Sequence, residues 1–577
     1  MPLLPHFLHS LSLRARRLGV NLRLWQITRA VLLHRPRPQQ DGSSPGNGAR
    51  QTASPAHRLL PTAHPPVVFF NASTRLAGIS QNAAFALLAS LGLQLAGVPV
   101  IHFACRAGMT RCVLGAAYHD PTQPPPCRHC IAQSRWLLLN APVVSFDYAP
   151  SPELTAALRG LSAAEMMEFH WPAAGAWPVP GASLPIPLGP LVLPALRWVL
   201  RRHHLNDDEP TRALFREFIQ SAYRVAMEFN ALLAQVQPQA VVVFNGQFFP
   251  EATARWLARQ RGLRVISHEV GLLPFTAYFT EGEATAYPLD IPADFELNDA
   301  QNARLDEYLS RRFQGQFSMA GIQFWSGMTH LDEAFLARAA QFKQIVPVFT
   351  NVIFDTSQPH SNVVFPHMFA WLDLVLDLAR QHPETLFVLR AHPDETRPGK
   401  ESRESVAQWV VANQAAALPN LIFIPSQETL SSYELIRRSK FVMVYNSTIG
   451  LEASLLGVAV LCAGRARFTQ LPTVYFPSSI PAFREQAEAF LASGMAAEGR
   501  SALPAPSEFQ RNARRFLYTQ LFLSSLPFGE FLEEDGIWPG FVRLKPFAWQ
   551  RLQPENSSAI RAIIKGVLHG GPFELDE

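Results

Sequence analysis

Cysteine and long apolar runs are both scarce in this chain. Five cysteines among 577 residues are too few for a disulfide scaffold, which favours a reducing compartment. No apolar run reaches the 18 or so residues that a membrane-spanning helix needs, because the two longest candidates, 83–97 and 188–200, are interrupted by a polar residue or a proline. The N-terminus also lacks the apolar block and cleavage site of a secretory signal. We therefore expect a cytoplasmic protein.

Two phosphate-binding motifs are missing as well. The chain contains no GxxxxGK[ST] and no strand-linked GxGxxG, which argues against an ATPase and against a dinucleotide-dependent enzyme. What is present is a composition of 48% apolar and only 17% charged residues. A chain of this length and composition can bury large cores and is expected to form several domains rather than a disordered polymer.

Acidic residues are almost absent from the first 66 positions. That segment holds nine arginines, no lysine and one acid, Asp41, so it carries +8 and leaves −4 for residues 67–577. The mildly acidic remainder gives no reason to expect nucleic-acid binding. Apolar residues recur every three or four positions between Phe7 and Leu33, so residues 1–35 are predicted to form a basic amphipathic segment. Such a segment is typical of peripheral contact with the inner membrane face, and equally of a helix packed on the body or a disordered arm.

Residues 36–66 are rich in Pro, Gly, Ser and Gln and are predicted to be a flexible linker.

Two halves follow, 67–330 and 331–480, in which apolar strand-like runs alternate with helical patterns, and 481–577 is expected to be a mostly helical tail. The alternation predicts an α/β protein with doubly wound parallel sheets. The predicted strands are 67–71, 98–103, 240–244 and 263–267 in the first half, and 345–350, 386–390, 421–424, 441–445 and 458–462 in the second.

Polar residues follow three predicted strands of the second half. Because an open α/β sheet binds ligands beyond the carboxyl ends of its strands, these residues form the candidate donor site. They are Asn351 after the first strand, Arg390, His392 and Pro393 at the end of the second, and Asn446, Ser447, Thr448 and Glu452 after the fourth. Ser447 is expected to cap a helix that starts at Thr448, His392 and Arg390 to face phosphate, and Glu452 to accept from ribose hydroxyls. Each feature taken singly is also typical of an ordinary cap, loop end or solvated helix residue.

Two of these motifs resemble a known family. Arg390-Ala391-His392-Pro393 and the segment from Asn446 to Ala453 are similar to the paired motifs of the capsule polysaccharide biosynthesis proteins, which include Kdo transferases. The resemblance covers about 345–476 and implies a GT-B-like fold, two Rossmann-like domains facing across a cleft. It also implies a metal-independent glycosyltransferase whose C-terminal domain binds the nucleotide sugar, with phosphate held by His392, Ser447 and Thr448 and ribose by Glu452. Related motifs occur in sialyltransferases and polyol-phosphate transferases.

The first half supplies candidates for catalysis and for the acceptor. His268 and Glu269 follow the predicted strand 263–267, so Glu269 is a candidate base for the acceptor hydroxyl, with His268 tuning it. Asn245 and Gln247 are candidate acceptor-binding amides. Glu281 and Glu283 are further candidate bases, and Glu269 is equally typical of a turn cap or an arginine partner.

Cysteines gather in one short stretch. Cys105, Cys112, Cys127 and Cys130 are the clustered thiols, and Cys127 and Cys130 have the CxxC spacing of a zinc knuckle. The cluster predicts a structural zinc site, although buried or incidental thiols fit it equally well. No cofactor is otherwise expected besides the nucleotide-sugar substrate.

Together these patterns predict a cytoplasmic glycosyltransferase that moves a sugar from a nucleotide-activated donor to a saccharide or lipid-linked acceptor in surface polysaccharide synthesis. Two alternatives remain at this point. One is a polyol-phosphate transferase of the teichoic-acid type, and the other is a non-catalytic sugar- or nucleotide-binding subunit of a polysaccharide assembly.

Overall fold

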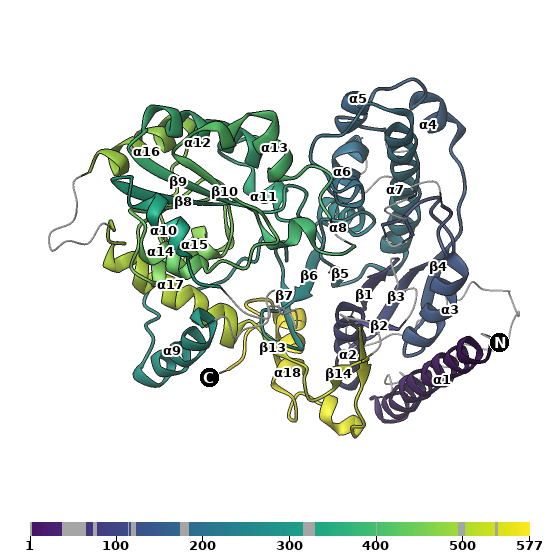
Figure 1. Cartoon of the computed structure of the whole chain (residues 1–577). Helices are drawn as coiled ribbons and strands as arrows, with labels where there is room; N and C mark the ends of the chain where they lie inside the picture. The colour runs from purple at the N-terminus through teal and green to yellow at the C-terminus, as the bar shows by residue number, and fades with distance from the viewer. Residues whose placement is uncertain are drawn as a thin grey trace, which may run out of the picture. The chain divides into compact units, whose positions relative to one another are not determined.

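A computed structural model describes residues 3–36, 65–72, 78–113, 115–116, 120, 123–172, 184–314, 329–399, 401–493, 502–536 and 541–576, with only the backbone described for 3–18. Most of the predicted linker, 36–66, therefore lies outside the described residues. The chain divides into two compact units (Figure 1). Unit 1 comprises residues 1–199, 205–285 and 523–577, and unit 2 comprises 200–204 and 286–522.

The core of unit 1 is a seven-stranded sheet of order β13-β7-β6-β5-β1-β3-β4. The five strands from β6 to β4 are parallel, whereas β7 and β13 run antiparallel to their neighbours. A separate three-stranded sheet has the order β14-β15-β2. The strands of unit 1 are β1 (Val67–Asn71), β2 (Ile79–Ser80), β3 (Val100–Cys105), β4 (Val143–Phe146), β5 (Ala240–Phe244), β6 (Arg264–Val270), β7 (Thr276–Thr280), β13 (Leu526–Pro527), β14 (Leu532–Glu534) and β15 (Phe541–Leu544).

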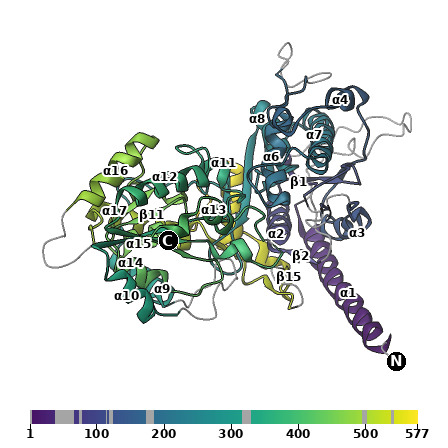
Figure 2. The same cartoon turned by 45° about the horizontal axis from the view of Figure 1, so that its top comes forward.

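The described part of unit 1 contains nine α-helices. They are α1 (Leu3–His34), α2 (Gln81–Leu95), α3 (Cys127–Leu137), α4 (Pro152–Ala157), α5 (Ala163–Met167), α6 (Leu188–Leu200), α7 (Glu209–Val236), α8 (Glu251–Gln260) and α18 (Ser558–His569). The predicted amphipathic segment forms α1, which packs against α2, α3 and β15 (Figures 1 and 2). Leu24, Ile27 and Val31 are buried there, so protein covers this part of the apolar face. Leu22, Trp25 and Leu33 remain exposed.

Unit 2 is built on a five-stranded parallel sheet of order β10-β9-β8-β11-β12. In Figure 1 α12 and α13 lie on one face of this sheet and α14 and α15 on the other. The strands are β8 (Gln344–Phe349), β9 (Thr385–Arg390), β10 (Leu421–Ile424), β11 (Val442–Val444) and β12 (Val460–Cys462). The helices are α9 (Asp299–Phe313), α10 (Glu333–Ala339), α11 (Gln358–Ser361), α12 (Met368–Gln381), α13 (Val406–Ala412), α14 (Ser432–Arg437), α15 (Ile449–Leu455), α16 (Ile480–Ala492) and α17 (Ser507–Tyr518).

Both units share one strand topology. Counted in chain order, the parallel strands of each sheet follow the order 3-2-1-4-5, which matches five of the six positions of the doubly wound order 3-2-1-4-5-6. The predicted α/β class with two Rossmann-like domains is confirmed. In each sheet the strand order reverses beside the first strand, between β1 and β5 in unit 1 and between β8 and β11 in unit 2.

The units do not follow the predicted boundaries at 330 and 480. Residues 286–313 pack with unit 2 because Arg514 pairs with Asp306 and Arg515 donates to the carbonyl oxygen of Ala293. The predicted helical tail is also wrong as a single element: 481–522 completes unit 2, while 523–577 returns to unit 1 and contributes the strands β13, β14 and β15 as well as α18. These pairings link residues that are hundreds of positions apart, which local patterns cannot show.

Candidate functional site

The donor-site residues lie at the carboxyl edge of the unit 2 sheet. Asn351 follows β8 and Asn446 follows β11. The strand order reverses between these two strands, and open α/β sheets bind ligands at such a reversal. Nδ2 of Asn351 donates to Oδ1 of Asn446 at 2.7 Å. Nδ2 of Asn446 in turn donates to the hydroxyl of Ser361 at 2.7 Å. The structure thus brings Asn351 and Asn446 together, and their hydrogen bond ties the two loops of the edge.

His392 stands on the neighbouring loop, two residues after β9. Its Nδ1 accepts from the backbone N–H of Asp394 at 3.2 Å, so a neutral ring carries its proton on Nε2. Burial lowers the pKa of His392, although the carboxylates of Asp394 and Asp355 oppose the shift. A neutral imidazole with a donor at Nε2 can hydrogen-bond a phosphate oxygen. Pro393, the next residue, begins the 3-10 turn Pro393–Thr396 and shapes this loop.

Ser447 and Thr448 are half-buried and lie at the start of α15. The helix begins at Ile449, with Thr448 at the cap position, and no side chain caps its backbone N–H groups. The predicted cap at Ser447 is therefore wrong, because the chain turns one residue later than expected. The Ser447 carbonyl instead accepts from the N–H of Gly450 at 3.1 Å. Neither hydroxyl caps the helix, so either can form a hydrogen bond with a ligand.

Arg390 has a scaffold role that the sequence did not reveal. Its side chain is only 6% exposed, and its guanidinium donates to the carbonyl oxygens of Glu428, at 3.2 Å, and Leu430. Burial lowers the pKa of Arg390 to about 10. Arg390 was predicted to face the donor phosphate, but its guanidinium instead fastens the loop after β10 to the end of β9.

Glu452 is a member of a buried polar cluster in unit 2. It is 4% exposed, and Oε1 accepts from Nη2 of Arg312 at 2.6 Å while Oε2 accepts from the Tyr433 hydroxyl. Burial disfavours a charge on Arg312, but the Glu452 carboxylate outweighs burial and raises the pKa of Arg312. Burial and Glu452 together raise the pKa of Tyr433. Both oxygens of Glu452 therefore have protein donors, and the predicted ribose contact is replaced by an ion pair between α15 and α9.

Unit 1 places Glu269 inside a strand and not in the predicted turn. β6 extends to Val270 because its end pairs with the antiparallel strand β7. The Glu269 carboxylate accepts from Nδ2 of Asn82 at 3.0 Å and from Nδ2 of Asn245 at 2.8 Å. Asn245 follows β5 with φ of 60°, so Glu269 is held beside the point where the strand order of unit 1 reverses. Open α/β sheets bind ligands near such a point.

His268 cannot tune Glu269, because adjacent residues of a strand point to opposite faces of the sheet. His268 is buried and stacks on Phe279 at a ring-centroid distance of 5.1 Å. That part of the catalytic prediction is wrong, and His268 belongs to the opposite face.

The remaining first-half candidates are engaged within unit 1. Nε2 of Gln247 donates to Glu283 at 2.7 Å, and Glu283 also pairs with Arg255 and, at 3.4 Å, with Arg259. Gln247 is buried, so this amide positions a charged cluster rather than facing a ligand in this structure. Glu281 pairs with Arg264.

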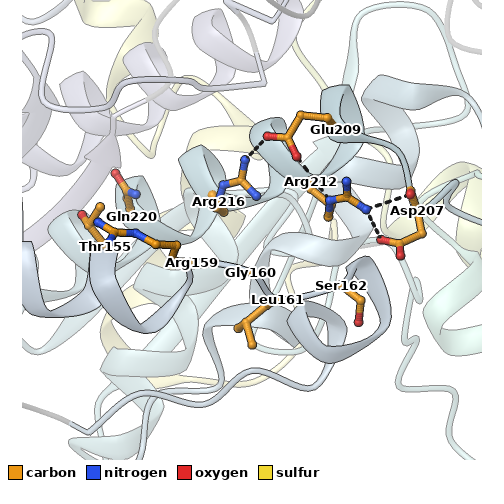
Figure 3. Close-up of a pocket in the computed structure, with 10 residues that line it drawn as sticks. All are labelled: Thr155, Arg159, Gly160, Leu161, Ser162, Asp207, Glu209, Arg212, Arg216 and Gln220. Atoms are coloured by element: carbon orange, nitrogen blue, oxygen red, sulfur yellow. Dashed lines mark hydrogen bonds and ion pairs between the residues drawn. The ribbon is translucent and has the colours of Figure 1, made fainter.

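An arginine-lined pocket of about 630 Å³ in unit 1 was missed by sequence reasoning (Figure 3). Its lining includes three arginines and two acids: Arg159, Arg212, Arg216, Asp207 and Glu209. Glu209 pairs with Arg212 at 3.3 Å and with Arg216, and Asp207 pairs with Arg212 at 3.2 Å. Arg159, on the loop after α4, is exposed and adds a third guanidinium. The surplus of one positive charge favours an anionic ligand. The three consecutive acids at 207–209, followed by Arg212 and Arg216, were the available signal.

This pocket lies beyond the carboxyl edge of the unit 1 sheet. Tyr148, two residues after β4, donates to Gln220 of the pocket lining at 3.3 Å. Glu269 is four strand positions away along the same edge, which at about 4.8 Å per strand is roughly 19 Å. One extended saccharide chain can span that distance.

Comparison with known proteins addresses unit 2 most directly. Residues 322–472 match the model of the family described as "Capsule polysaccharide biosynthesis protein". This segment is similar to that family. The match includes β8 to β12 and every predicted donor residue, so the resemblance predicted from the two motifs is confirmed.

Individual proteins are similar either over part of the chain or at low sequence identity. "Protein FixF" of Sinorhizobium fredii (strain NBRC 101917 / NGR234) is 33% identical over 234 residues, 39% of this chain and 48% of that protein. The chain thus spans about half the length of this curated relative. A Thermosulfurimonas dismutans structure described as KpsC, beta Kdo 2,4 transferase, is 13% identical with a TM-score of 0.31, covering 50% of this chain and 80% of that one. A Neisseria meningitidis UDP-GlcNAc 2-epimerase, bound to UDP-GlcNAc, is 13% identical with a TM-score of 0.22, covering 79% and 98%. Scores this low do not assign a function.

Proposed function

We propose that the protein is a GT-B-type glycosyltransferase of surface polysaccharide synthesis that binds a nucleotide-activated sugar at the carboxyl edge of the unit 2 sheet. The observation that carries this proposal is the placement of His392 and of the Ser447 and Thr448 hydroxyls on loops that follow β9 and β11, within the segment matching the capsule family. The donor at Nε2 of His392 and the two hydroxyls suit phosphate oxygens, and the resemblance implies that no metal is needed to hold them.

Product mass spectrometry tests the reaction. The purified chain is incubated with CMP-, UDP-, GDP- and CDP-activated compounds and a saccharide or lipid-linked acceptor. We expect release of free nucleotide and an acceptor heavier by one sugar residue. A phosphodiester product would instead identify the polyol-phosphate alternative, and nucleotide binding without turnover by any donor would favour a non-catalytic subunit.

Replacing His392 by alanine is expected to weaken nucleotide binding about 10- to 150-fold, because one hydrogen bond to a charged phosphate is worth roughly 1.5–3 kcal/mol. Titration calorimetry with the nucleotide that binds the wild type measures the change. His330→Ala is the matched control, since the side chain of His330 is 90% exposed in the same unit and pairs only with Glu434 among the contacts described for it. Equal affinities of His392→Ala and wild type would remove His392 from the donor site.

For the acceptor, we propose an acidic saccharide whose charged groups enter the arginine-lined pocket of unit 1. Arg159→Ala should raise the KM for such an acceptor about tenfold with little change in kcat, as expected for loss of about 1.4 kcal/mol of binding. The control Arg543→Ala removes an exposed arginine of unit 1 that pairs with Glu533, outside the pocket. An unchanged KM for the acidic acceptor would contradict this assignment.

The place of action proposed is the cytoplasmic face of the inner membrane. None of the described helices is both long and apolar enough to cross a bilayer. Among the side chains of α1 that the structure describes, Leu22, Trp25 and Leu33 are the exposed large apolar residues, and they lie in a basic segment suited to anionic lipid. Replacing all three by serine should abolish co-sedimentation with anionic vesicles while the buried Leu24 and Val31 keep α1 docked. Unchanged co-sedimentation would end the proposal of membrane contact.

A further inference from the structure

Four of the five cysteines converge on one small cavity of unit 1. Cys105, Cys112, Cys127 and Cys130 all line a cavity of about 20 Å³, together with apolar residues such as Ala72 and Ile131. None of the four forms a disulfide, and the fifth cysteine, Cys462, is buried in unit 2. The thiols come from the end of β3, the loop that follows it, and the first turn of α3. This site is independent of the donor, acceptor and catalytic residues proposed above.

Two of the thiols lie in similar Cys-x-x-Gly turns. The backbone N–H of Gly108 donates to Sγ of Cys105 at 3.1 Å, whereas the backbone N–H of Gly115 donates to the carbonyl oxygen of Cys112 at 3.0 Å. Both glycines are required by close packing. A Cβ at Gly108 would lie 2.2 Å from the ring of Phe146, and one at Gly115 would lie 2.5 Å from Cβ of Pro125. The first of these turns therefore directs an N–H donor at sulfur, the second-sphere contact that stabilises a bound thiolate.

The other two thiols stand at the start of α3. Cys127 is the first residue of this 11-residue helix and Cys130 lies in its first turn. The positive end of the helix dipole favours thiolates there. The end of β3 and the loop after it thus supply two thiols, and the start of α3 supplies two more. Four thiols from these two places suit closed four-sulfur coordination of a metal ion.

We propose that Cys105, Cys112, Cys127 and Cys130 bind one structural Zn²⁺ ion as thiolates. The four thiols release their protons to solvent on binding, and sulfur fills all four tetrahedral positions, so the site has no open position for catalysis. Among the described residues, no three ligating side chains already stand in a geometry that holds an ion. Binding therefore requires the thiols to close on the cavity, which fixes the start of α3 to the end of β3.

The full chain, purified without chelator under reducing conditions, should contain one zinc per chain by elemental analysis. A double Cys127→Ser and Cys130→Ser variant should lose this metal, whereas Cys462→Ser, the matched control from unit 2, should keep it. If the double variant does not fold, cobalt exchange into the wild type decides instead. A tetrahedral cobalt spectrum with thiolate charge-transfer absorption supports the site. The proposal would be overturned if the wild-type protein lacked stoichiometric zinc and also gave no such spectrum with cobalt. A disulfide among these cysteines would overturn it as well.

Discussion

Replacing Arg312 by methionine should destabilise unit 2 by about 3–5 kcal/mol. The change leaves the carboxylate of Glu452 buried without its cationic partner, and removal of one member of a buried ion pair typically costs that much. Arg312 and Glu452 side chains are only 9% and 6% exposed, so water cannot replace the lost contact. Urea unfolding, followed by hydrogen exchange of unit 2 peptides so that the two units are read separately, measures the loss.

Two comparisons make this prediction specific. Arg514→Met removes an ion pair between α17 and α9 that is open to solvent, since the Arg514 and Asp306 side chains are 29% and 61% exposed. Loss of this ion pair should lower the free energy of unfolding by no more than about 1 kcal/mol. Adding Glu452→Gln to Arg312→Met should restore much of the stability, because no charge is then left buried. If Arg312→Met were as stable as wild type but bound nucleotide poorly, Glu452 would be a ligand residue after all and the structural role assigned here would fail.

Replacing Glu269 by glutamine should lower kcat about 10²- to 10⁴-fold with nucleotide affinity unchanged. This expectation rests on the proposed function, in which the Glu269 carboxylate takes the proton of the acceptor hydroxyl, and general-base catalysis contributes about that factor. Glutamine preserves the side-chain shape and an oxygen for the amides of Asn82 or Asn245, so the edge of the sheet should stay intact. Initial rates at saturating donor and acceptor measure the effect.

The matched control is Glu281→Gln on the neighbouring strand end. Glu281 pairs with Arg264 and is 37% exposed, so its replacement should leave kcat within a factor of about two, as for an ordinary surface change. A Glu269→Gln enzyme with wild-type kcat would exclude Glu269 as the base.

The sequence predicted the sheets well because their strands are buried on both faces. Continuous apolar runs such as 67–71 and 240–244 lack the alternation of polar residues that a strand with one solvent-exposed face would show. The strands β1 and β5 have the predicted bounds. The same reasoning placed Asn351, His392 and Asn446 on one edge, since a parallel sheet brings the carboxyl ends of its strands together.

The errors concern partners that are distant in sequence. Glu452 lies 140 residues from Arg312, and the loop carbonyls that hold Arg390 lie about 40 residues away. Nothing local distinguishes a carboxylate that faces a ligand from one that faces a buried arginine. The strand β6 was also predicted too short, because its last residues are held by the antiparallel β7, and one extended strand sends His268 and Glu269 to opposite faces. The arginine-lined pocket likewise joins residues 155–162 to 207–220 and has no continuous motif.

A crystal structure of the protein soaked with the nucleotide that binds it tests the central claim most directly. We expect the phosphate group beyond β8, β9 and β11, with one oxygen within hydrogen-bond distance of Nε2 of His392 and others at the hydroxyls of Ser447 and Thr448. A nucleotide bound in full occupancy at any other place, with these three side chains unchanged, would contradict it.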